Sequence, residues 1–329
     1  MATHKYDEHD PYNDGYHRGD RVVPFRVLSL GMSRTATAST QRALVMLGFS
    51  NCYHGYRPLR RQNVPLASSD IARWMRAFEL KWGAHPASGP SSLKQVSRIL
   101  QDVLRGRPIS WINVRPGPSR GKALLRDRKF WDDLLGDCQS ACDLPVIAFW
   151  REIWEAYSED PEVKVVLNIR PIESWFKSVQ VLGKIYEPSL SKKLLCLLDP
   201  LFCMQFEMGR RLAIHVFGYD ANFKTLFRND GSTEKVYEAN NAEIRAIIPE
   251  DRLLLWAPQD GWQPLCAFLN RPLPAQDTPV PRVNDAAQTL QFAQDLTRAA
   301  IIRVLRRLLS FVLLASSLTL TTRLFKTSA

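Results

Sequence analysis

Residues 30–40, LGMSRTATAST, combine one arginine with small and hydroxyl-bearing side chains. An apolar run precedes them and a helical pattern follows, which predicts a strand, a tight turn and a helix. Such a turn directs backbone N–H groups and the positive end of a helix dipole towards one point, where an anion can bind. The Walker and dinucleotide glycine patterns are absent, because Gly31 is the only glycine in the segment. We interpret the segment as another type of phosphate-binding turn, with an ordinary strand-to-helix connection as the alternative.

Arg170 directly follows the apolar run VKVVLNI, residues 163–169, at the start of a predicted helix. The dipole at the N-terminus of this helix favours an anion near Arg170. Proline also favours the first helical position, so a helix that merely starts with Arg-Pro is the alternative to an anion site.

Two further polar side chains stand at the ends of predicted strands. The strand predicted near residues 138–143 ends at Asp143, and a short strand predicted near residues 49–54 ends at His54. Aspartate is a preferred helix N-cap, and a histidine here could simply be packed, so a structural role stays open for both residues. His215 lies on an apolar helical stretch and is predicted to be structural.

The order of predicted elements indicates an α/β fold. Strands near residues 25–30, 49–54, 138–143, 163–169 and 251–258 alternate with helices, which predicts a parallel sheet covered on both faces. The first predicted helix follows the turn and ends near residue 48. Further helices are expected over residues 66–81, 92–105, 130–138, 146–158, 170–186, 232–249 and 261–270. Ligands of such sheets bind beyond the carboxyl ends of the strands. We therefore expect Gly31, His54, Asp143 and Arg170 to converge on one crevice.

The first segment resembles the 5′-phosphosulfate loop of sulfotransferases, and especially that of a largely fungal sulfotransferase-like family, which reads roughly Gly-x-x-Arg-Thr-Gly-Thr-x-Ser. This resemblance implies a three-layer P-loop-type fold and 3′-phosphoadenosine 5′-phosphosulfate as co-substrate, without a metal. Arg34 would contact the phosphosulfate bridge, and Thr35, Thr37 and the loop amides would contact its oxygens. The implied cofactor-binding loop comprises Ser33, Arg34, Thr35, Ala36, Thr37, Ala38 and Ser39.

The resemblance also assigns roles further along the chain. Arg170 and Ser178 would hold the 3′-phosphate of the nucleotide. Asp143, in the family's Cys-Asp motif before an apolar residue and proline, would be the general base, and His54 would contact the acceptor or the base. Ala36 departs from the family pattern, which has glycine there. If this position needs a positive φ, the methyl group costs on the order of 1 kcal/mol and weakens the site.

The resemblance covers roughly residues 25–80 and 126–285, and it implies sulfuryl transfer to a hydroxyl of a small, hydrophobic molecule. Two alternatives keep the family but not the reaction: a nucleotide-binding membrane scaffold, or a natural-product tailoring enzyme that catalyses cyclisation or dehydration. Nucleic-acid binding would rest only on the formal charge of +11, so we expect no nucleic-acid partner. The oligomeric state cannot be read from the sequence.

Residues 1–20 are predicted to be a flexible tail, residues 21–285 one α/β domain with an insertion at 83–125, and residues 290–329 a membrane-associating tail. Within this tail, residues 308–322 are uncharged and follow a basic amphipathic stretch. A helix of 15 residues spans about 23 Å of a hydrocarbon core of about 30 Å, so a short anchor or an in-plane helix is predicted, with a buried core helix as the alternative. The N-terminus lacks a secretory signal pattern, and the scattered cysteines indicate reduced thiols without a zinc site. The expected location is the cytoplasmic face of a membrane.

Overall fold

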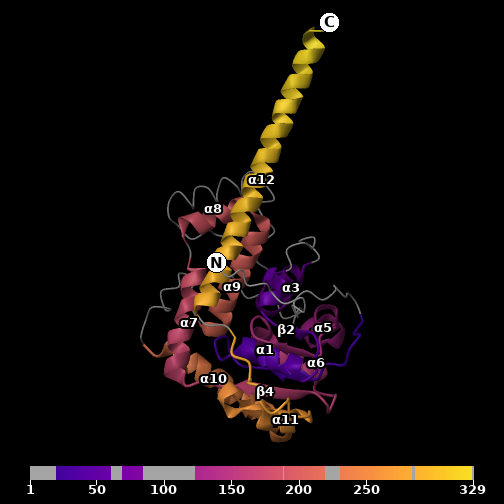
Figure 1. Ribbon diagram of the computed structural model, residues 1–329, viewed down its shortest axis with the longest axis vertical. Helices are drawn as coiled ribbons and strands as arrows, with labels where there is room; N and C mark the ends of the chain where they lie inside the picture. The colour runs from indigo at the N-terminus through magenta and orange to yellow at the C-terminus, as the bar shows by residue number, and fades with distance from the viewer. Residues whose placement is uncertain are drawn as a thin grey trace.

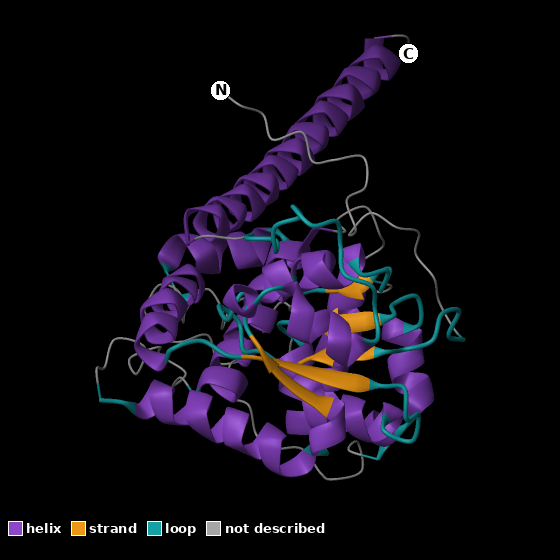
Figure 2. Ribbon diagram, turned by 60° about the horizontal axis from the view of Figure 1, so that its bottom comes forward, coloured by secondary structure: helices purple, strands orange, loops and turns teal. Residues whose placement is uncertain are grey.

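The computed structural model describes residues 20–60, 69–83, 123–187, 189–218, 230–283 and 286–327. Within these residues, a five-stranded parallel sheet has the order β2-β3-β1-β4-β5 (Figure 2). The strands are β1 (Val27–Ser29), β2 (Cys52–Tyr53), β3 (Ser140–Cys142), β4 (Lys164–Asn168) and β5 (Leu253–Trp256). Strand β1 pairs with β3 on one side and β4 on the other, so the chain order reverses there and leaves a crevice at its carboxyl end. The predicted α/β fold with a parallel sheet is confirmed.

Helices cover both faces of this sheet (Figures 1 and 2). They are α1 (Thr37–Met46), α2 (Tyr56–Arg60), α3 (Asp70–Trp82), α5 (Arg128–Leu135), α6 (Trp150–Tyr157), α7 (Ile172–Tyr186), α8 (Leu190–Leu198), α9 (Pro200–Phe217), α10 (Ser232–Ile247), α11 (Trp262–Leu269) and α12 (Ala286–Thr327). Short 3-10 helices span residues 124–126, 146–149, 250–252 and 258–260.

Successive residues of each strand face opposite sides of the sheet and contribute to two separate hydrophobic cores. Val27 and Val166 face the smaller core, which α1 and α11 complete. Leu28 and Val165 face the larger core, to which α3, α5, α6, α7 and α9 contribute. Neighbouring strand residues point to opposite faces, so near-continuous apolar strands are what a sheet buried on both sides requires.

Several predicted helices differ from the structure at their ends. The helix expected over residues 66–81 is α3, which begins at Asp70 after Ser69 caps it by accepting a hydrogen bond from the Ala72 N–H at 3.3 Å. The helix expected over residues 146–158 starts as the 3-10 helix and becomes α-helical at Trp150. The predicted helix over residues 92–105, most of the predicted insertion and nearly all of the predicted N-terminal tail lie outside the described residues. The domain boundaries stay predictions.

Helix α12 packs against the domain and then projects far beyond it (Figure 1). Its first part contacts α7, α8 and α9, and Ala300 and Val304 are buried there. From Leu305 to Leu314 its large apolar side chains are exposed, with 71% of Phe311 open to solvent. Within the described residues, no helix has both the length and the apolar character required to cross a bilayer. The short membrane-crossing anchor is therefore not supported, and in-plane association stays a prediction.

Candidate active site

The turn after β1 has the backbone shape of an anion-binding loop. Arg34 and Ala36 adopt positive φ angles of 75° and 68°. Helix α1 then begins at Thr37 with no side-chain cap and no acidic residue in its first turn. The first N–H groups of the helix are thus not capped by a side chain, and the dipole favours a negative charge in front of them. Ala36 thus lies in the left-handed region, where its methyl group raises the conformational free energy of the backbone relative to glycine.

Asn168, at the end of β4, holds this turn against the sheet. Its fully buried side chain accepts a hydrogen bond from the Ser29 hydroxyl at 2.7 Å and donates one to Thr40 Oγ1 at 2.7 Å. From α7, the Trp175 ring donates to the Ser33 carbonyl at 3.0 Å. The turn is therefore fixed from two neighbouring elements before any ligand binds, which lowers the entropy cost of binding.

Two of the predicted loop hydroxyls are already committed to the protein. Thr35 Oγ1 donates to the Met32 carbonyl at 2.7 Å, and Ser39 Oγ accepts from the Val283 N–H at 3.0 Å. Gly31 approaches Thr35 and Asn168 so closely that a β-carbon would overlap both. The backbone N–H of Thr35 also donates to the Met32 carbonyl, at 3.1 Å, so both hydrogen-bond donors of Thr35 shape the loop and the predicted contact with oxygens of the co-substrate is not what this geometry supports.

The structure brings the two predicted anion sites into direct contact. Arg34 Nε donates to Ser178 Oγ at 2.9 Å, and Arg34 Nη1 donates to Thr289 Oγ1 at 2.7 Å. Arg170 Nη1 donates to the Arg34 carbonyl at 2.9 Å, although the two residues are 136 positions apart in the sequence. Tyr237 fixes Arg170, because its hydroxyl accepts from the Arg170 N–H and donates to the Arg170 carbonyl, both at 3.0 Å. Two guanidinium groups and an uncapped helix N-terminus thus concentrate positive potential in one place.

Asp143 and His54 meet beside this region. The N–H of Tyr56 donates to His54 Nδ1 at 3.3 Å, so the proton of a neutral His54 is on Nε2, which lies 3.5 Å from Asp143 Oδ2. Asp143 Oδ1 is buried, and no residue in the described part of the chain forms a hydrogen bond with it. The 3-10 helix that follows has Pro145 at its N-cap and no side-chain cap, so the capping interpretation of Asp143 is not what the structure shows.

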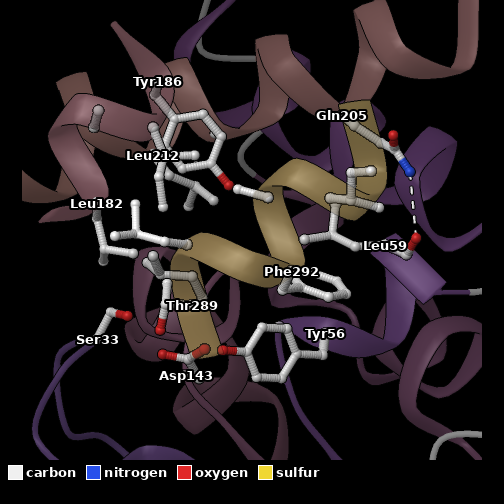
Figure 3. A pocket seen from close by; sticks show the side chains of 18 of the residues that line it. Ser33, Tyr56, Leu59, Asp143, Leu182, Tyr186, Gln205, Leu212, Thr289 and Phe292 are labelled. Atoms are coloured by element: carbon white, nitrogen blue, oxygen red, sulfur yellow. Dashed lines mark hydrogen bonds between the residues drawn. The ribbon is translucent and has the colours of Figure 1, made fainter. Parts of the chain in front are cut away.

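Arg34, Asp143 and Arg170 line one end of a cavity of about 570 Å³ (Figure 3). Its polar end includes Ser33, Arg34, Ala36, Thr37, Ala38, Asp143 and Arg170. Its other end is largely apolar and is formed by α7, α9 and α12. Of the predicted site residues, four are not among those that line this cavity: Thr35, Ser39, His54 and Ser178.

Sequence reasoning did not identify the residues of the apolar end. Among them are Leu182, Phe202, Phe206, Leu212, Phe217 and Phe292. Phe292, on α12, packs edge-on against Tyr56 with ring centroids 4.7 Å apart, which joins the C-terminal helix to the His54 strand end. No bounds were predicted for helices α8 and α9, although the stretch around His215 in α9 was expected to be helical. The one signal was the abundance of apolar residues around 195–227, which any hydrophobic core also needs.

Comparison with known proteins adds an independent result. Residues 26–289 match the family described as Sulfotransferase domain. The chain is also similar to Ava biosynthesis cluster protein M of Aspergillus versicolor, with 31% identity over 262 residues, which cover 77% of this chain and 79% of the relative. The matched region contains the turn after β1, the Asp143 strand end, Arg170 and Ser178. The predicted family is therefore confirmed: this chain belongs to the sulfotransferase domain family.

Proposed function

We propose that this protein transfers a sulfuryl group from 3′-phosphoadenosine 5′-phosphosulfate to a hydroxyl group of a small, hydrophobic molecule. One observation carries the proposal: Arg34 and Arg170 converge on the polar end of a cavity whose other end is apolar. The polar end suits a nucleotide with two phosphorylated positions, and the apolar end suits an organic acceptor.

The residues present fit this nucleotide. Arg170 and Ser178 would hold the 3′-phosphate, while Arg34 and the loop amides of residues 33–39 would hold the phosphosulfate. Among the described residues, Arg34 donates hydrogen bonds to the hydroxyls of Ser178 and Thr289, and an anionic oxygen is a stronger partner for a guanidinium group than a hydroxyl is.

The nucleotide supplies the sulfuryl group, and residues of this chain manage the proton. The acceptor oxygen forms a bond to sulfur as the sulfur–oxygen bond to the phosphate breaks, and the hydroxyl proton passes to Asp143. Asp143 lines the cavity, and His54 Nε2, which lies 3.5 Å from Asp143 Oδ2, would orient the carboxylate towards the hydroxyl. Arg34 stabilises the negative charge that develops on the departing phosphate, a role of prearranged electrostatics.

The relative named as a biosynthesis cluster protein supports a role for this chain in making a natural product. Ala36 favours a second candidate, a tailoring enzyme or nucleotide-binding scaffold of the same family that no longer transfers sulfate, because its methyl group lies in the phosphate loop at a positive φ. A product that gains one SO₃ only when the sulfate donor is present identifies the transferase. A product formed equally without the donor identifies a tailoring enzyme, and nucleotide binding without any product identifies a scaffold.

The binding test uses the full-length protein and 3′-phosphoadenosine 5′-phosphate in a calorimeter. Arg170→Ala removes a charge-assisted contact to the 3′-phosphate, so its affinity should fall about 10- to 100-fold. Arg126→Ala is the matched control, because this exposed arginine pairs with Glu155 on the surface and does not line the cavity. Equal affinities in all three proteins would refute the nucleotide assignment.

A further inference from the structure

Tyr186, in the last turn of α7, reaches from the apolar end of the cavity towards its interior (Figure 3). Its ring packs on α9 at Gly209, where a β-carbon would overlap the ring. Glycine is unfavourable inside a helix by roughly 0.5–1 kcal/mol relative to alanine, so its use here marks a close approach. The ring position of Tyr186 thus depends on a residue that leaves space for it.

The Tyr186 hydroxyl is a polar group in apolar surroundings. Among the described residues, none forms a hydrogen bond with it, and the apolar side chains of Leu182, Leu212 and Phe292 line the same cavity. Burial raises the pKa of Tyr186 to about 12, and the nearby Tyr56 and Asp143 add to this shift. The hydroxyl therefore keeps its proton throughout the neutral pH range and can act as a hydrogen-bond donor.

We propose that the Tyr186 hydroxyl donates a hydrogen bond to a carbonyl oxygen of the acceptor while the hydroxyl of the same acceptor lies at Asp143. This inference rests on the proposed function and narrows its substrate class to apolar molecules that carry both a hydroxyl and a carbonyl group. A polar group in an apolar cavity discriminates strongly between ligands, because a ligand that lacks a hydrogen-bond acceptor leaves this group unsatisfied.

Two matched probes test the proposal: 4-hydroxybenzophenone and 4-benzylphenol, which differ only by a carbonyl in place of a methylene group. Their dissociation constants are measured by calorimetry on the full-length protein, with and without 3′-phosphoadenosine 5′-phosphate. The wild type should bind the ketone between about threefold and tenfold more tightly than the methylene compound. Tyr186→Phe should remove this preference and leave the affinity for the nucleotide unchanged.

Two variants separate the hydroxyl contact from a general loss of structure. Tyr157→Phe also removes a tyrosine hydroxyl, but one that bonds to Arg21 and Asp132 away from the cavity, so it should keep the preference for the ketone. Gly209→Ala displaces the ring and should remove the preference although the hydroxyl is still present. The inference is overturned if the wild type binds neither probe, if it binds both equally, or if Tyr186→Phe keeps the preference. A ketone preference without any nucleotide binding would instead overturn the proposed function alone.

Discussion

Replacing Ala36 by glycine should stabilise the protein. The φ of 68° places the alanine methyl group in the left-handed region, at a cost of roughly 1–2 kcal/mol that glycine does not incur. Glycine in turn loses more backbone freedom on folding, which costs about 0.4–1 kcal/mol. The difference predicts an unfolding free energy higher by about 0.5–1 kcal/mol in Ala36→Gly.

Urea unfolding of the full-length protein measures this difference, and Ala43→Gly is the matched control. Ala43 lies inside the same helix α1 and is fully buried, so glycine there loses helix propensity and a packed methyl group, and the unfolding free energy should fall by about 1 kcal/mol or more. The two alanine-to-glycine changes should therefore have opposite signs. A decrease of similar size in both variants would show that the turn is not strained at Ala36.

Three other outcomes are expected. Asn168→Ala should lower the unfolding free energy in urea by about 2–4 kcal/mol, because the hydroxyls of Ser29 and Thr40 lose their buried partner; an unchanged midpoint would contradict this role. Burial and two nearby cations lower the pKa of His215 to about 4, so its NMR signals should titrate there, and its contribution to stability should be complete above pH 6.5 and be lost as the pH falls through 4. Titration of His215 near its ordinary value would contradict its burial. Phe311→Ser should change the unfolding free energy by less than about 0.5 kcal/mol, since this side chain is 71% exposed, and a larger decrease would show that it packs.

The parts of the fold with a strong local pattern could be predicted from the sequence. Near-continuous apolar runs mark the strands because both faces of the sheet are buried. The turn around Arg34 and the Arg170 strand end were predicted because each combines a strand end, a helix start and a basic side chain. The parallel pairing of β1 and β4 brings the two segments together. The sequence predicted that they converge on one crevice, but not the hydrogen bond between Arg170 and Arg34.

The rest of the site lacks a local signal. Tyr186 and Gly209 matter through their mutual contact between α7 and α9, and the spacing of residues along one helix does not encode a contact with another. The apolar end has the same composition as a filled core, because cavity walls and packed interiors use the same side chains. Likewise, helix α12 is one continuous helix whose first part closes the site around Thr289, whereas the sequence pattern emphasised its uncharged end.

The most direct test of the central claim is a crystal structure of the full-length protein with 3′-phosphoadenosine 5′-phosphate. The account predicts the 5′-phosphate at the turn between Ser33 and Ser39 and the 3′-phosphate on Arg170 and Ser178, with the apolar end of the cavity still open for an acceptor. A nucleotide bound elsewhere, or one that contacts only one of the two loops, would contradict it.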